Sequence, residues 1–299
     1  MDLVGQVGTS ALILAFSFGV GILLQGIERK LFARLQNRIG PPLLQPLYDI
    51  LKLFSKETLV PRNSVKSVFT LAPLVSVAAI STAALFVPLA GVSYWGFAGD
   101  VIVLLYVIVL SSIGIVLGAS ASGSPFAAIG ASREITLIIS FELPLAMAVL
   151  SAAFLSKSFS LGAMAGNVSF LLVFGAIAYL ACMLGELARA PFHIAEAETE
   201  IVEGIYTEYS GRLLAAYKIA EAMKFYVFPM LFAALFVPIP QVGVAGMLAL
   251  QLAFALAAVV LVSIVGAVSA RFKIHQAAGF YLKGVLALAV LQMAVAVFS

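Results

Sequence analysis

The 299-residue sequence has little charge and one cysteine. Charged residues make up 10% of the chain, whereas soluble domains typically contain about 25%, and the mean hydropathy is +1.14. A lone thiol, Cys182, cannot form an internal disulfide or supply the roughly four ligands of an iron–sulfur cluster. We therefore expect Cys182 to be a small apolar packing residue, and the composition excludes a soluble domain.

Motifs for local redox or nucleotide chemistry are also absent. The sequence contains no CxxC, HExxH, GxGxxG or Walker motif. Its two histidines, His193 and His275, titrate near neutrality, but a lone histidine at a membrane surface is most often simply hydrated. Both are weak candidates for proton transfer. Any redox or nucleotide cofactor of the process that this chain serves is expected on other chains.

Five long runs without a charged side chain indicate an integral membrane protein. Each run exceeds the ~20 apolar residues that cross a bilayer. Lipid cannot satisfy unpaired backbone groups, and the runs are too continuous for barrel strands, so we expect an all-α bundle. The N-terminus lacks the basic region of a cleavable signal, so the first run is expected to be a retained helix. The runs are residues 3–27, 67–99, 101–132, 158–185 and 225–270.

Turn signals divide these runs into eight predicted spans in a single transmembrane domain, residues 1–299. Two prolines in the segment from Val237 stop a helix because proline removes a backbone donor. The glycine- and serine-rich stretch 118–132 is predicted to separate the third span from the fourth. We find no internal repeat. The predicted spans are residues 6–27, 68–90, 101–121, 135–155, 168–187, 213–236, 244–268 and 276–298.

The distribution of lysine and arginine predicts the orientation of the bundle. Most of the 17 basic residues fall on one side, chiefly in segments 28–66 and 186–212, whereas the opposite loops contain only Lys157. Cytoplasmic loops are enriched in Lys and Arg. The pattern therefore predicts a multi-pass protein of the cell membrane with both termini on the outer face. The basic excess gives no reason to expect a nucleic acid partner.

A segment too polar to span the membrane, residues 28–57, follows the first predicted helix. After Pro46 it has the pattern of an amphipathic surface helix. Such a helix either closes the bundle at the membrane surface or forms the floor of a docking surface for a soluble partner. The rigid turn Gly40-Pro41-Pro42 favours docking slightly. The apolar face is Leu47, Ile50, Leu51 and Phe54, and the opposite face is Asp49, Lys52 and Lys56.

Acidic residues are concentrated in one predicted cytoplasmic loop, between the fifth and sixth spans. Apolar residues such as Phe192, Ile194, Ile201 and Tyr206 alternate with the acids, so this loop is predicted to fold back into the mouth of the bundle. Crowded carboxylates in a dry cleft cannot all ionise, and those with a raised pKa can carry protons. The alternative is an ordinary solvated loop. The acids are Glu186, Glu196, Glu198, Glu200, Glu203 and Glu208, six of the 14 in the chain.

Two acidic residues lie in the region of the predicted fourth span. Glu142 is in mid-helix, with Pro144 just beyond it, and has no local partner of opposite charge. Glu134 is eight residues earlier, about two helical turns, and so shares roughly the same face. A charge at the bilayer centre costs at least ~2.5–3.5 kcal/mol, and such residues usually face a wet interior and mark ion or proton routes.

The sixth and eighth predicted spans also contain charged residues. Lys218, Glu221 and Lys224 recur at intervals of three residues, and Lys283 interrupts the eighth span. These residues extend the predicted line of acids from the cytoplasmic mouth into the membrane, where water could join carboxylates into a proton relay. The alternative for Glu221 is a structural ion pair with Lys218 or Lys224.

Three segments of the sequence resemble a known family. "ERKLFARLQNRIGP", "LLQPLYDILKLFSKE" and "RAPFHIAEAETEIVEGIYTEYSG" are similar to segments of the subunit that joins the peripheral and membrane arms of respiratory complex I. They resemble still more its homologue in membrane-bound energy-converting [NiFe] hydrogenases, because the turn "GPPLLQP" is contracted and "AEAETEIVEG" has the hydrogenase form. The contracted turn puts a quinone site in doubt, and His193 stands where the family commonly has an acid.

The resemblance implies a membrane-anchor and coupling subunit with eight spans and no cofactor of its own. Its partners would be an iron–sulfur small subunit with [4Fe-4S] clusters, a large subunit with a nickel–iron centre and antiporter-like membrane subunits, with ferredoxin as electron donor. The pumped ion would be a proton or sodium. The alternatives are the quinone-site subunit of complex I and a free-standing secondary transporter, although the latter often shows inverted repeats that we do not find.

The resemblance and the buried charges together give two sets of candidate residues. The predicted proton path is Glu142, Glu186, Glu196, Glu198, Glu203 and Glu221, with Glu134, Lys224 and Lys283 beside it. The predicted docking residues for the soluble module lie in segments 28–66 and 186–212 and are Arg29, Arg38, Asp49, Lys52, Glu208 and Arg212.

Overall fold

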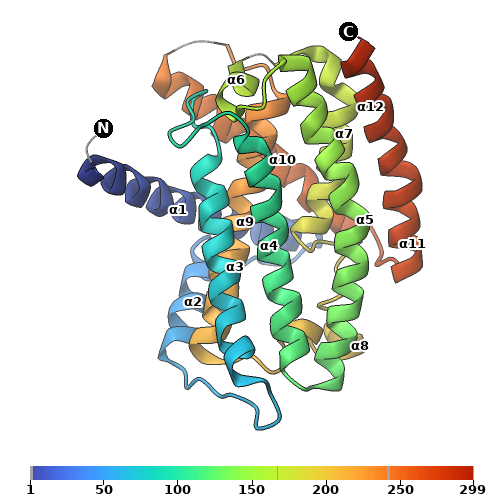
Figure 1. Ribbon diagram of the computed structural model, residues 1–299. Coiled ribbons are helices and arrows are strands. Elements are labelled where there is room, and N and C mark those ends of the chain that lie inside the picture. Colours follow the sequence, from blue (N-terminus) through green and yellow to red (C-terminus); the bar gives the residue numbers. More distant parts are fainter. Residues whose placement is uncertain (1–2, 167, 241–242, 299) are drawn as a thin grey trace.

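The computed structural model describes residues 3–166, 168–240 and 243–298, and these residues are helical apart from turns and one isolated bridge between Leu89 and Val92. In Figure 1, α3 (Lys66–Phe86), α4 (Asp100–Ala121) and α5 (Pro125–Ser156) run side by side along the long axis. α1 (Leu3–Leu35) is strongly inclined to them, and its N-terminal end projects from the side of the bundle.

Seven helices in the described part of the chain are long and apolar enough to cross a membrane. Besides α1, α3, α4 and α5 they are α9 (Gly211–Phe236), α10 (Val244–Val268) and the continuous stretch Ile274–Phe298. That stretch consists of α11 (Ile274–Gly279), the π-helical segment η3 (Phe280–Val285) and α12 (Leu286–Phe298). The all-α membrane architecture is confirmed.

The predicted fifth span, residues 168–187, corresponds to a shorter apolar helix, Phe170–Glu186. It consists of η1 (Phe170–Leu172) followed by α7 (Val173–Glu186). α7 packs between α5 and α12, and its residues Tyr179, Cys182 and Met183 are fully buried. Its length leaves the count of eight crossings a prediction, whereas the burial of Cys182 agrees with a packing role.

The predicted loop over residues 118–132 is wrong. α4 continues to Ala121 and α5 starts at Pro125, so only residues 122–124 connect them. Glycine and serine look like helix breakers, but in membrane helices small residues allow close approach of neighbouring segments. A Cβ on Gly130 would lie 2.8 Å from the backbone nitrogen of Ile205, which shows how tightly α5 packs against the acidic loop.

Helix α9 forms the centre of the bundle and packs against α1, α3 and α10. Its aromatic residues Phe225, Tyr226 and Phe228 are completely buried. α1 crosses it closely because Gly21 has no side chain, and a Cβ at that position would collide with the carbonyl oxygen of Ala222. This crossing brings the polar end of α1 against the charged residues of α9.

The remaining short elements lie at the two ends of the bundle. α2 (Gln45–Ser55) and α8 (Glu198–Ile201) lie at the end opposite the C-terminus, while α6 (Leu161–Gly166) lies near the C-terminal end (Figure 1). The 3₁₀ turn η2 (Gly204–Tyr206) follows α8. α2 confirms the predicted helix after Pro46, but only part of its apolar face is covered. Ile50 is buried, whereas Leu51 and Phe54 are exposed.

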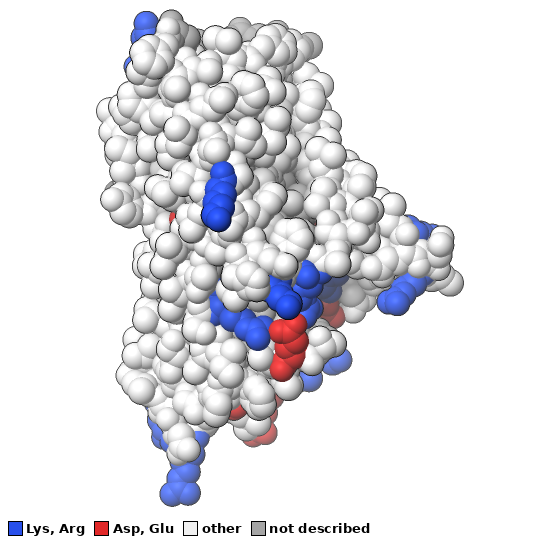
Figure 2. Space-filling view, turned by 90° about the vertical axis from the view of Figure 1, so that its right-hand side faces the viewer, with Lys and Arg blue, Asp and Glu red and all other residues white. Residues whose placement is uncertain are grey.

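Charge divides the surface into two zones. On the face that Figure 2 shows, most basic and acidic side chains gather in the lower half, and the upper half shows only isolated charged side chains on an otherwise uncharged surface. An apolar belt next to a charged end is the surface expected of a helical membrane protein. The C-terminal end of α12 lies at the uncharged end, opposite α2 and α8.

Candidate functional site

Arg189 links α1, α9 and the acidic loop. Its Nε atom lies 3.2 Å from Glu28 of α1, and its Nη2 atom lies 3.2 Å from Glu221 of α9. The guanidinium also stacks on the Phe225 ring at 4.9 Å. Burial favours the neutral form, but Glu28 and Glu221, with Glu196, raise the pKa of Arg189 above its ordinary value. The arginine therefore stays charged and binds the three segments together.

Glu221 has two further partners. It accepts a hydrogen bond from the Gln25 amide at 3.0 Å and pairs with Lys218 at 3.0 Å. The sequence left open whether Glu221 would pair with Lys218 or with Lys224, and the structure shows Lys218. Glu221 is thus ion-paired on two sides, which supports the structural alternative for this residue.

A second buried pair lies one turn deeper on α9. Lys224 donates to Glu186 at 3.1 Å and to the Ser112 hydroxyl of α4 at 2.9 Å. The Glu186 side chain is completely inaccessible to solvent, and its Oε1 atom has no hydrogen-bond partner among the described residues. Helices α4, α7 and α9 therefore enclose a lysine–carboxylate pair. One carboxylate oxygen of this pair, Oε1 of Glu186, accepts no hydrogen bond from the described residues.

A narrow cavity of about 30 Å³ connects these pairs. A space of this size can hold a water molecule where polar groups surround it. Charged residues from α5, α7, the acidic loop and α9 line it together with two tyrosines. They are Glu134, Glu186, Glu196, Glu221, Lys224, Tyr206 and Tyr217.

Glu142 lies between this network and the outer flank of the bundle. Glu142 lies near Glu186, and its Oε1 atom is buried without a hydrogen-bond partner among the described residues. Glu142 also lines an apolar groove of about 700 Å³ between α4 and α5, with Leu105, Tyr106 and Leu143 among its neighbours. Glu142 is therefore the point where the buried charges reach the membrane-facing surface.

The acids of the loop do not all join the buried network. Glu196 does, and it lies 3.2 Å from His193. Glu200 binds Arg133 at 2.7 Å and approaches Arg271 at 3.7 Å at the surface, and the hydrogen bond from Arg133 lowers its pKa.

Three further loop acids lie apart from the cavity or outside the described side chains. Glu203 is exposed and Glu208 is partly buried, and neither lines the cavity. Glu198 begins α8, but its side chain lies outside the described part of the structure. Among the basic candidates, Lys283 is exposed on η3 and does not line the cavity. Of the predicted proton path, the structure brings five residues to one cavity, namely Glu134, Glu186, Glu196, Glu221 and Lys224. It does not bring Glu203 or Lys283 there.

Sequence reasoning missed several members of the network. Glu28 and Arg189 each follow an apolar run, and charges at such positions resemble ordinary charges of cytoplasmic segments. Gln25 and Ser112 are polar residues inside apolar runs, and their placement within a span was the only available signal. The pairing itself could not be found because the partners are far apart in the chain.

The predicted docking residues Arg29, Asp49 and Lys52 lie together at the α2 end of the bundle. Arg29 of α1 holds Asp49 of α2 at 2.8 Å, and Gln45 donates to the same carboxylate at 2.9 Å. Lys52 lies beside them on a cleft of about 230 Å³ between α1, α2 and α9. Arg38 and Arg212 are exposed, so both are accessible to a partner.

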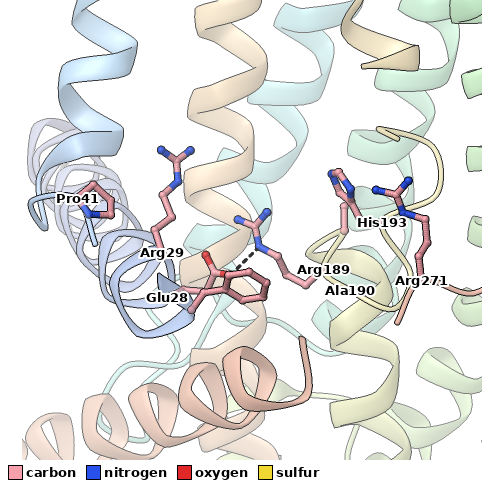
Figure 3. Close-up of a pocket in the computed structure, with 9 residues that line it drawn as sticks. Glu28, Arg29, Pro41, Arg189, Ala190, His193 and Arg271 are labelled. Atoms are coloured by element: carbon pink, nitrogen blue, oxygen red, sulfur yellow. Dashed lines mark ion pairs between the residues drawn. The ribbon is translucent and has the colours of Figure 1, made fainter. Parts of the chain in front are cut away.

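A larger cleft of about 540 Å³ opens on the other side of the α1 end. Figure 3 shows Arg29, Arg189, Arg271 and the His193 ring extending in the same direction from three different parts of the chain. Glu28 is the one acidic residue in its lining, where it pairs with Arg189. The cleft is basic and suits an acidic surface. In the described residues, no group of three or more His, Cys, Asp or Glu could hold a metal ion.

Comparisons with known proteins agree with this architecture. A family model described as NADH dehydrogenase matches residues 8–297. The chain belongs to the NADH dehydrogenase family. It is 33% identical over 249 residues to the H subunit of the NADH-quinone oxidoreductase of Thermomicrobium roseum, covering 73% of each chain. It is 34% identical over 256 residues to the corresponding protein of Anoxybacillus flavithermus, covering 76% of each.

A solved structure gives a nearly complete match to this NADH dehydrogenase family member. It comes from the membrane-bound sulfane sulfur reductase, described as an archaeal respiratory membrane complex, with a TM-score of 0.89 and 29% identity. The match covers 98% of this chain and 99% of that one. The chain is therefore a membrane subunit of a complex I-type respiratory complex, of the same kind as these relatives, and the predicted family is confirmed.

Proposed function

We propose that this chain is the anchor and coupling subunit of an energy-converting hydrogenase. It would bind a soluble module that reduces protons with electrons from ferredoxin and would couple this reaction to the movement of protons or sodium ions. The module's [4Fe-4S] clusters and nickel–iron centre would belong to an iron–sulfur small subunit and a [NiFe] large subunit. The hydrogenase form of the motifs "GPPLLQP" and "AEAETEIVEG" supports this acceptor.

One observation carries the coupling role: a continuous set of buried charges runs from the cytoplasmic end into the bundle. It begins at the Glu28–Arg189–Glu221 group, continues through the small cavity to Lys224 and Glu186, and ends at Glu142. The route joins residues of α1, the acidic loop, α9, α7 and α5, and water can complete it in the cavity between Glu221 and Lys224. Such intramembrane carboxylates are the groups that proton relays use.

The ionisable groups of this network are sensitive to one another's charge because they interact in a medium of low dielectric constant. Two unit charges 4 Å apart interact by about 4 kcal/mol at an effective dielectric constant of 20, against about 1 kcal/mol in water. A change in charge or position at the cytoplasmic end would disturb Arg189 first. The disturbance would pass to Glu221 and then to the Lys224–Glu186 pair. Glu142, whose Oε1 atom has no partner, would take up or release the proton at the far end.

The two cytoplasmic clefts would form the docking surface of the soluble module. Arg29, Asp49 and Lys52 fix α1 and α2 around one cleft, and the basic lining of the other would attract acidic side chains. Arg38, Glu208 and Arg212 would add contacts at the rim. With this end in the cytoplasm, both termini would face outward. Antiporter-like membrane subunits would receive the proton signal beside the groove at Glu142.

A second acceptor has a specific observation in its favour. The solved chain with a TM-score of 0.89 belongs to a sulfane sulfur reductase complex, so a sulfur-reducing module is the alternative to a hydrogenase. The relatives that reduce quinone share the family but match a smaller part of the chain. The buried network would serve the same coupling role with each of these acceptors.

The test is a Glu142→Gln variant of the whole complex in sealed membrane vesicles. We expect wild-type vesicles to evolve hydrogen from reduced ferredoxin and to translocate ions. We expect the variant to keep hydrogen evolution with an artificial donor while translocation falls about tenfold or more, because glutamine cannot carry the proton. Glu200→Gln is the matched control, since Glu200 lies at the surface outside the network.

Different results would overturn the coupling role and the choice of electron acceptor. Undiminished translocation in Glu142→Gln would show that the route bypasses this carboxylate. Wild-type vesicles that reduce sulfane sulfur or quinone but evolve no hydrogen would overturn the acceptor alone.

A further inference from the structure

Lys283 lies inside a span, as Lys218 and Lys224 do, but it lacks the carboxylate partner that those two lysines have among the described residues. It lies in η3, the π-helical segment of the span Ile274–Phe298, and its side chain is exposed. No ion pair joins it to another residue among those that the structure describes. No other Lys, Arg, Asp or Glu occurs in this span.

Its depth makes this exposure unfavourable in lipid. Lys283 is nine residues into the span, about 13 Å along the helix, and half of the hydrocarbon thickness is about 15 Å. A lysine near the bilayer centre is rare and normally faces the bundle interior or an ionic partner. Its exposed neighbours Phe280, Leu282, Val290 and Leu291 are apolar, so the lysine stands in an apolar helix face.

The helix cannot rotate to bury this lysine. Tyr281, two residues earlier, is fully buried, and its hydroxyl donates to the carbonyl of Ala181 at 3.0 Å. The Tyr281 ring also packs against Phe141 and Phe192. Val285 is buried on the same side. With Tyr281 and Val285 fixed inward, Lys283 points away from the bundle. π-Helical segments of this kind are frequent at functional sites.

We propose that the helix face around Lys283 binds a transmembrane helix of a second membrane subunit, and that this helix presents an Asp or Glu carboxylate to Lys283. Charge complementarity requires an anionic partner at this depth. The surface also allows a helix to approach closely, because the position next to the lysine is Gly284, beside which a Cβ would meet no atom within 4 Å. Membership of a multi-subunit respiratory complex provides such partners.

The environment of Lys224 shows which groups a partner of Lys283 would have to supply. Lys224 is the other lysine deep in a span, and a buried carboxylate and a hydroxyl satisfy it within this chain. Lys283 has neither. No acid of the described part of this chain forms an ion pair with Lys283, whereas Lys224 pairs with Glu186. The carboxylate therefore has to come from another chain, and this inference does not depend on which acceptor the soluble module uses.

The test compares the subunit composition of whole complexes purified in mild detergent through a tag on this chain. In Lys283→Gln we expect one membrane subunit to fall about tenfold or more relative to this chain, because its carboxylate would be left unpaired in the membrane. Lys283→Arg keeps the charge and is expected to retain that subunit. Lys157→Gln is the matched control for loss of a lysine, since Lys157 lies in a loop outside the spans.

A photo-crosslinking residue at the exposed position Ala287, in an otherwise wild-type complex, tests the contact without removing Lys283. The expected product joins Ala287 to a transmembrane segment that contains Asp or Glu, in the same subunit that Lys283→Gln loses. An unchanged subunit composition in Lys283→Gln would overturn the proposal. Crosslinks confined to lipid would also overturn it, since Lys283 would then reach towards headgroups.

Discussion

Helix α9 and the acidic loop place their charges in opposite ways. α9 has few charged residues, but Glu221 and Lys224 are held inside the bundle, with 17% and 8% of their side chains exposed. The loop is rich in acids, yet half of the Glu200 side chain is exposed and Glu203 lies at the surface. A high local density of carboxylates in the sequence is therefore a poor guide to which carboxylates are buried.

The difference arises from the partners that the fold supplies. The two deepest charges on α9 each meet an opposite charge from a separate element, as Lys224 meets Glu186 of α7 and Glu221 meets Arg189. Buried charges persist only when paired in this way. The loop buries Ile201 and Ile205, but it leaves Glu200 to surface arginines and Glu203 to water. The loop thus packs against the bundle through its apolar residues and places Glu196 at the small cavity.

Removing the deepest charge is expected to have the largest effect on stability. Lys224→Met should lower the free energy of unfolding by about 3–5 kcal/mol, because it leaves Glu186 buried without its partner. The melting temperature of the detergent-solubilised complex should fall by on the order of 10 °C. The double variant Lys224→Met/Glu186→Gln should recover most of this loss. A single variant as stable as the wild type would show that the pair is not enclosed as described.

An intermediate effect is expected at the Arg189 end of the network. Glu221→Gln removes the negative charge that pairs with Arg189 and Lys218 and replaces one acceptor oxygen with an amide donor, and should destabilise the protein by about 1–3 kcal/mol. Arg189 keeps Glu28 as a partner, so the loss is smaller than at Lys224. Hydrogen exchange should increase in residues 188–196, which Arg189 ties to the bundle. Lys218→Gln is the control and should change exchange less, and equal effects would contradict the central role of Arg189.

The smallest effect is expected at the surface of the loop. Arg133 holds the pKa of Glu200 below its ordinary value of 4.5, so its stabilisation is complete above that value and is lost as the pH falls through the lower pKa of the folded state. Glu200→Gln should shift the melting temperature at pH 7 by at most about 2 °C. The wild type and the variant should converge below pH 4. A shift at pH 7 as large as that of Lys224→Met would remove the distinction between the loop and α9.

Local patterns predicted the helices well and their ends less well. Seven predicted spans match long apolar helices of the described chain, and α2 begins where Pro46 predicted it. The loop over 118–132 failed because the sequence pattern of a flexible turn and that of a closely packed membrane helix are the same, namely glycine, alanine and serine. Only the contact of Gly130 with Ile205 distinguishes the two.

The sequence by itself determined the class of the protein, its spans, its family and the presence of charges inside the membrane. These follow from the length of apolar runs, from spacing within one helix and from motifs, all of which are local. Only the tertiary structure decided which charges meet. Spacing could pair Glu221 with Lys218. The partnership of Arg189 with Glu28, and the lack of an ion-pair partner for Lys283 among the described residues, depend on how separate helices cross and rotate.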